Sequence, residues 1–174
     1  MKIAYFTEMG FEGKIDRTTH NNMRTEFAWM SALDADHYNI HSPKMKHDYD
    51  LGIVIVPKTN PEVNLSYLRK NCKKIAIQQE GPSWYFQDYP LTRQFHFHNH
   101  LMEADYIFVH NESDKKYYRG ITSKPVFVMR SLMLTDGLLP RSESGGDVII
   151  GGNFVSWYGG FDSYMVASVF QPEA

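Results

Sequence analysis

Short apolar runs, separated by polar and amphipathic segments, make up most of residues 1–130. The strongest run, residues 51–56, is continuous, rich in β-branched side chains and followed by Pro57. Such a run is typical of a strand in a parallel sheet that helices cover on both faces. Five further runs are predicted to be strands: residues 2–7, 37–41, 74–79, 105–109 and 125–129.

Between the predicted strands, apolar residues recur at helical spacing. After Asn22 the apolar side chains are separated by four, three and three positions, so they share one helix face. These side chains are Met23, Phe27, Met30 and Leu33. We therefore expect a helix that begins at Asn22 and ends before Asp34.

Two later segments carry helix-start signals. Asn60 is a candidate N-cap with Pro61 in the first turn of a short helix. The inward side chains expected for this helix are Val63, Tyr67 and Leu68. Pro90 can begin a longer helix that reaches Ala104, with Phe97 on its inner face.

The alternation of strands and helices predicts an α/β fold. We expect a doubly wound, mainly parallel, Rossmann-like sheet with helices on both faces, because right-handed crossovers place helices there. Residues 1–140 would form this domain. Residues 141–147 (RSESGGD) have the composition of a linker, and residues 148–174 would begin a second Rossmann-like domain.

Charge and composition narrow the classes of function. Lys and Arg total 18 and Asp and Glu total 20, so the net charge of −2 does not indicate a nucleic-acid binder. The single cysteine, Cys72, excludes an internal disulfide and fits a reducing compartment, so we expect a cytoplasmic protein. Residues 148–172 carry little charge but contain Asp162 and several glycines, which argues against a membrane span.

The loops after the strands are the expected place for a ligand, because open parallel sheets bind ligands beyond the carboxyl ends of their strands. Glycines there can let the backbone approach a ligand, an aromatic ring can stack on it, and polar side chains can bind its hydroxyls or act as a general base. The same residues could equally serve turn geometry and loop hydrogen bonding. The candidates are Gly10 and Gly13 for backbone approach, Trp84 for stacking, Glu80 and His110 for hydroxyl contacts, Asn111 for orientation and His20 as a base.

Several familiar motifs are absent from the chain. There is no GxGxxG fingerprint, no P-loop and no Gly-x-Ser-x-Gly elbow, which disfavours dinucleotide enzymes, P-loop NTPases and α/β-hydrolases. His96, His98 and His100 occupy every second position, and on a helix His96 and His100 would share a face. Neither a cysteine nor another obvious third metal ligand lies nearby in the sequence, so we expect a surface histidine cluster and no metal site.

Three segments of the chain resemble parts of GT-B glycosyltransferases, in particular the short retaining enzymes that bacteriophages carry. Residues 74–82 (KIAIQQEGP) resemble a strand and loop that face the cleft between the two domains of that family. Residues 101–118 (LMEADYIFVHNESDKKYY) resemble a helix end, a strand and a polar turn at the same cleft. Residues 148–167 (VIIGGNFVSWYGGFDSYMVA) resemble the opening of the second domain.

The resemblance implies the acceptor-side half of a nucleotide-sugar-dependent transferase, truncated early in its second domain and inactive alone. A nucleotide-sugar donor would bind mainly to the other half, and no tightly bound cofactor is implied. His20 and Glu80 would be the candidate catalytic residues, and a sugar or glycosylated acceptor the partner. The family often has Arg and Lys near the second-domain glycines, where this chain has Asn153 and Tyr158.

A non-catalytic, flavodoxin-like binding or assembly module remains the alternative. The segment 146–174 contains ten large apolar side chains, which need burial. We therefore expect a homo-oligomer formed through this C-terminal segment.

Overall fold

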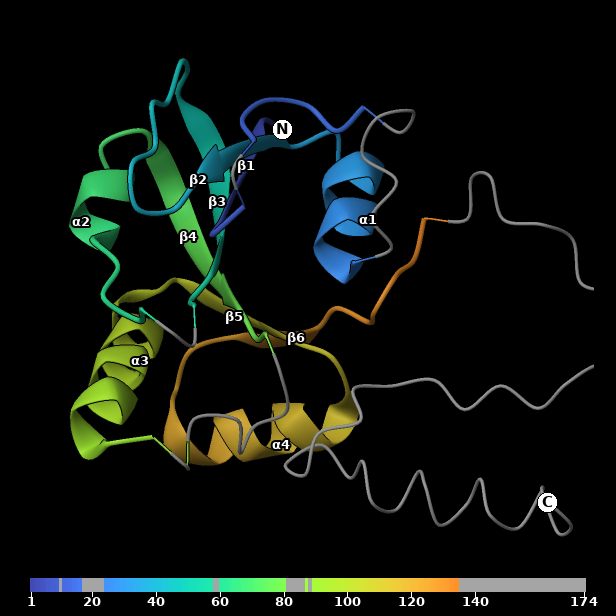
Figure 1. Cartoon of the computed structure of the whole chain (residues 1–174). Coiled ribbons are helices and arrows are strands. Elements are labelled where there is room, and N and C mark those ends of the chain that lie inside the picture. The colour runs from blue at the N-terminus through green and yellow to red at the C-terminus, as the bar shows by residue number, and fades with distance from the viewer. Residues whose placement is uncertain (10, 17–23, 58–59, 81–86, 88, 135–174) are drawn as a thin grey trace, which may run out of the picture. The chain divides into compact units, whose positions relative to one another are not determined.

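A computed structural model describes residues 1–9, 11–16, 24–57, 60–80, 87 and 89–134. Its strands form one six-stranded sheet in the order β2-β1-β3-β4-β5-β6, and all neighbouring strands are parallel (Figure 1). The strands are β1 (Ile3–Thr7), β2 (Asp36–Asn39), β3 (Tyr49–Ile55), β4 (Cys72–Gln78), β5 (Tyr106–Val109) and β6 (Val126–Val128). The predicted α/β, Rossmann-like parallel sheet is confirmed.

The central strands are buried on both faces, as their continuous apolar sequences require. All five residues of β1 are buried. Alternate side chains enter different clusters: Tyr5 packs with Ile53 on one face, and Phe6 packs with Val54 on the other.

Helices cover both faces of the sheet, as predicted. In Figure 1, α1 (Thr25–Ala32) lies on one side of the sheet, and α2 (Leu65–Leu68) and α3 (Leu91–Glu103) lie on the other. The fourth helix, α4 (Glu112–Ile121), packs Tyr118 into the same cluster as α2 and α3. The chain runs from β1 outward to β2 and then returns past β1 to β3, so the direction in which strands are added to the sheet reverses. Because every crossover is right-handed, this reversal puts the later helices on the opposite face from α1.

The start of α2 differs from the prediction. The N-cap is Asn64, whose side chain accepts a hydrogen bond from the N–H of Tyr67 at 2.9 Å, and not Asn60. Pro61 precedes the helix, and its carbonyl accepts from Nε2 of the His100 ring at 2.7 Å. Tyr67 is 42% exposed, so the expectation that it faces inward is wrong.

His100 also departs from the surface cluster expected for the three histidines. It is only 6% exposed because it faces residues 61–63, whereas His96 is half-buried and His98 is exposed. Burial lowers the pKa of His100, although its bond to the Pro61 carbonyl opposes that shift. This histidine therefore holds α3 against residues 61–63 as a neutral ring.

An ion network joins the amino-terminal edge of β4 to the start of β5. Asp105 accepts from the N–H of Ile75 at 2.9 Å and pairs with Arg69 at 2.9 Å and Lys74 at 3.0 Å. Burial alone would raise the pKa of Asp105, but these three partners lower it to about 2. The carboxylate thus ties together two neighbouring strands and the end of α2.

The linker at 141–147 and the second-domain opening at 148–174 lie outside the described residues. Within the described part of the chain, no helix is both long enough and apolar enough to cross a membrane.

Candidate functional site

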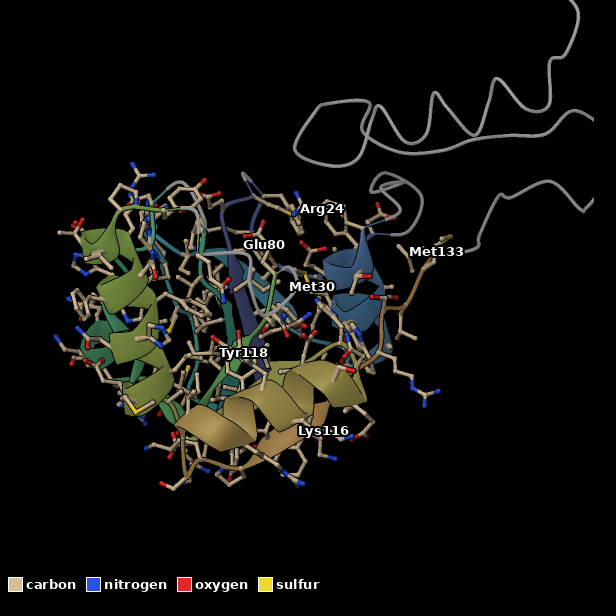
Figure 2. All side chains as sticks on the ribbon, turned by 90° about the horizontal axis from the view of Figure 1, so that it is seen from below. Arg24, Met30, Glu80, Lys116, Tyr118 and Met133 are labelled. Atoms are coloured by element: carbon tan, nitrogen blue, oxygen red, sulfur yellow. The ribbon has the colours of Figure 1, made fainter. Side chains whose placement is uncertain are left out.

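A cavity of about 210 Å³ lies at the carboxyl edge of the sheet, where the strand order reverses between β1 and β3. This is the switch point at which open α/β sheets bind ligands. Figure 2 shows Arg24 and Glu80 at this edge, near the first turn of α1. The lining residues are Thr7, Glu8, Met9, Arg24, Glu26, Ile55, Pro57 and Glu80.

The first turn of α1 supplies one charged wall of the cavity. Arg24 Nη2 lies 2.7 Å from Glu26 Oε1, and the Glu26 side chain is only 11% exposed. A carboxylate in the first turn is stabilised by the helix dipole and by the N–H groups that point out of the helix end. The wall therefore presents a buried carboxylate that is held in place by a guanidinium.

The opposite wall includes Glu80, which follows β4. Alternation along the strand places Glu80 on the same face as Gln78, just as Thr7 shares a face with Tyr5. Tyr5 and Gln78 are both buried, and the Tyr5 hydroxyl donates to Gln78 Oε1. This bond crosses β3 beneath the cavity and holds β1 and β4 at a fixed separation.

The Tyr5 hydroxyl stays protonated in this setting. Burial raises its pKa well above the ordinary value, and the nearby charge of Glu26 raises it further, while the bond to Gln78 opposes the shift. The Tyr5 hydroxyl therefore keeps the proton that it donates to Gln78.

Thr7 at the end of β1 is held by a buried histidine. Its hydroxyl lies 2.8 Å from His37 Nε2, and His37 Nδ1 lies 2.5 Å from the carbonyl of Phe11. Because a carbonyl can only accept, Nδ1 carries a proton, and in the neutral ring Nε2 then accepts from the Thr7 hydroxyl. The N–H of Met9 in turn donates to Thr7 Oγ1 at 3.1 Å. The chain of bonds orders the loop after β1.

Gly13 takes part in the same loop anchor. It forms an isolated antiparallel bridge with His37, with N···O distances of 2.9 and 2.8 Å. Its φ of 105° is a conformation that favours glycine. Both backbone polar groups of Gly13 are therefore used inside the protein, and Gly13 does not line this cavity.

The other predicted site residues are placed as follows. Glu80 lines the cavity. Asn111 caps α4: its side chain accepts from the N–H of Asp114 at 2.9 Å and donates to Asp114 Oδ2 at 2.8 Å. His110 follows β5 and does not line the cavity, and its buried Nδ1 has no hydrogen-bond partner among the described residues. Gly10, His20 and Trp84 lie outside the described residues.

Arg24 and Glu26 are the charged pair of the cavity, and neither was among the predicted site residues. The expected helix began at Asn22, which put both residues inside the helix and not at its start. The signal that could have found them is an acidic side chain in the first turn of the helix that follows β1, because such helices begin at the carboxyl edge of the sheet.

The cavity chemistry suits a ligand that donates hydrogen bonds. Its lining holds three carboxylates and one guanidinium, together with the Thr7 hydroxyl. Carboxylates only accept hydrogen bonds at neutral pH, so sugar hydroxyls or amines match them and phosphate groups do not. Across the described ranges, no cluster of His, Cys, Asp or Glu forms a metal site.

Comparison of the chain with protein-family models, with curated proteins and with solved structures finds no match.

Proposed function

We propose that the chain is the acceptor-side domain of a sugar transferase and binds a hydroxyl-rich acceptor in the switch-point cavity. The observation that carries the proposal is the lining of that cavity: Glu26 and Glu80 come from different elements and enclose a polar space beside Thr7. The resemblance of residues 74–82 and 101–118 to GT-B glycosyltransferases supports the same function.

The charge of the cavity supports an acceptor site over a donor site. A nucleotide diphosphate placed here would face the carboxylates of Glu8, Glu26 and Glu80, with Arg24 engaged by Glu26. Like charges brought together in a partly dry site are costly. The donor nucleotide would therefore bind outside this cavity, and the described domain alone would transfer no sugar.

Each lining residue has a role in this proposal. Glu80 and Glu26 accept hydrogen bonds from ligand hydroxyls, and either could receive the proton that an acceptor hydroxyl loses during transfer. Arg24 orients the Glu26 carboxylate through its 2.7 Å contact. The Thr7 hydroxyl is held in one orientation by its hydrogen bonds with the His37 ring and with the N–H of Met9.

Saccharide titration followed by backbone amide NMR tests the proposal. Methyl glycosides of glucose, galactose, mannose and N-acetylglucosamine would be added to the full chain. We expect at least one of them to shift the amide signals of Thr7, Met9 and Glu80. Glu80→Gln should weaken that binding at least about tenfold, which corresponds to ~1.4 kcal/mol.

Glu103→Gln is the matched control, because Glu103 is an exposed glutamate at the end of α3. It should leave the saccharide affinity unchanged. If no glycoside shifts the cavity signals, or if Glu80→Gln binds as tightly as the parent chain, the proposed function is wrong.

A flavodoxin-like binding module is the second candidate, and the strand order favours it. The order β2-β1-β3-β4-β5 is the flavodoxin-like order, in which a flavin mononucleotide binds at the same switch point. The carboxylate lining predicts that flavin mononucleotide does not bind here. Its binding, detected by quenching of flavin fluorescence, would favour this candidate over the transferase.

A further inference from the structure

A second, larger cavity lies along the same edge of the sheet, between the loop after β2 and the helix α2. Its volume is about 500 Å³, within the range of roughly 300–1,000 Å³ that is usual for small-molecule sites. Its lining is mixed, with polar, charged and aromatic side chains. The lining residues are Ile40, His41, Ser42, Pro43, Lys44, Glu62, Asn64, Tyr67 and Leu68.

The two cavities share a boundary made by the ends of β1 and β2. The N–H of Ile40, which lines the second cavity, donates to the carbonyl of Thr7, which lines the first, at 2.8 Å. Neighbouring strands lie only about 4.8 Å apart. The two cavities therefore meet at the carboxyl edge of the sheet, the first on the α1 face and the second on the α2 face.

Side chains also cross the boundary. Glu8 Oε1 in the first cavity lies 3.7 Å from His41 Nε2 in the second. Asn39 holds the two rims together, because its amide donates to the carbonyl of Met9 at 3.2 Å and accepts from the N–H of His41 at 3.0 Å. The groups at the boundary are therefore polar and can form hydrogen bonds.

Tyr67 gives the second cavity an aromatic surface. The residue is 42% exposed, so part of its ring is accessible to a ligand. Its hydroxyl donates to the carbonyl of Pro43 at 3.3 Å, which fixes the ring across the cavity. A ring with an apolar body and a tethered polar tip, surrounded by hydrogen-bonding side chains, is suited to a sugar ring, which has both apolar and hydroxyl-bearing surfaces.

We propose that the second cavity is an extension subsite for the same ligand, so that the domain binds a chain of linked sugars and not a single one. This inference rests on the proposed function, with the first sugar in the cavity at Glu80. The following sugar crosses the Glu8–His41 boundary and packs on Tyr67. The charges in this cavity have both signs, from Lys44 and Glu62, which suits a neutral oligosaccharide.

Chain-length dependence of binding tests the inference on the full chain. The monosaccharide that binds best would be compared with its α1–4-linked and β1–4-linked trisaccharides by NMR titration. We expect at least one trisaccharide to bind ten times more tightly or better, and to shift the amide signals of His41 and Tyr67, which the monosaccharide leaves in place.

Two substitutions separate stacking from folding. Tyr67→Ala should remove the gain from chain length and leave monosaccharide affinity unchanged, whereas Tyr67→Phe, which keeps the ring, should retain most of the gain. Tyr117→Ala is the matched control, because Tyr117 is a 37% exposed tyrosine on α4 that lines neither cavity, and it should change neither affinity.

The outcomes distinguish the two proposals. If a monosaccharide binds and responds to Glu80→Gln, but neither trisaccharide gains affinity or Tyr67→Ala keeps the gain, the extension subsite is wrong and the acceptor site stands. If no saccharide of either length binds, both proposals fall.

Discussion

A methyl group added at Gly52 should destabilise the protein, because the centre of the sheet has no room for it. Gly52 lies in β3 with Ala4 and Ile75 as its neighbours on the adjacent strands. A Cβ at this position would lie 2.9 Å from Cys72 Sγ and 3.1 Å from Phe6 Cε2. Both distances are shorter than ordinary van der Waals contact.

Neither neighbour can easily move away. Cys72 and Phe6 are 2% and 0% exposed, and the Phe6 ring stacks on Tyr38 with 5.9 Å between the ring centroids. Overpacking of a core typically costs about 1–3 kcal/mol. Replacing glycine within a strand recovers roughly 0.5–1 kcal/mol. Taking the midpoints of these two ranges, we expect Gly52→Ala to lower the free energy of unfolding by about 1 kcal/mol.

Urea denaturation with a reducing agent present measures the effect, and a double-mutant cycle identifies its cause. Cys72→Ala removes the closest atom, so Gly52→Ala should cost at least about 1 kcal/mol less in that background. Gly120→Ala is the control: a Cβ there meets nothing within 4 Å, and the residue lies in α4. It should stabilise the protein by roughly 0.5–1 kcal/mol. A Gly52→Ala variant as stable as the parent chain would refute the packing argument.

Three further predictions concern stability and assembly. Tyr49→Phe should cost about 1–3 kcal/mol in urea denaturation, because the Tyr49 hydroxyl donates to Asp36 Oδ2 at 2.8 Å and accepts from Tyr38 at 2.7 Å; the exposed Tyr117→Phe should be near neutral. Asp105 has a lowered pKa, so its contribution is present above the ordinary value of 3.8 and is lost as the pH falls toward 2. After solvent screening this amounts to about 1 kcal/mol, and Asp105→Asn should flatten the acid limb of a thermal-stability profile; an unchanged limb would contradict the assignment. The chain should be a homo-oligomer that becomes monomeric without residues 146–174, and light scattering that shows a monomeric full chain would contradict this.

The sequence alone was sufficient for the strands, the parallel sheet and the place of Glu80. Continuous β-branched runs such as residues 51–56 can satisfy their burial only inside a covered parallel sheet, and periodicity within one segment reports that directly. The position of Glu80 after such a run also follows from local order, because a residue that follows a parallel strand lies at its carboxyl edge.

The tertiary structure decided how these pieces combine. Which strands become neighbours depends on contacts between distant segments, so no local pattern shows that β2 pairs outside β1 and that the order reverses there. That reversal places Arg24 and Glu26 opposite Glu80. The burial of His37 and of His100 likewise depends on partners far along the chain, Thr7 and Pro61. Helix periodicity says which residues share a face, but only packing determines what that face meets.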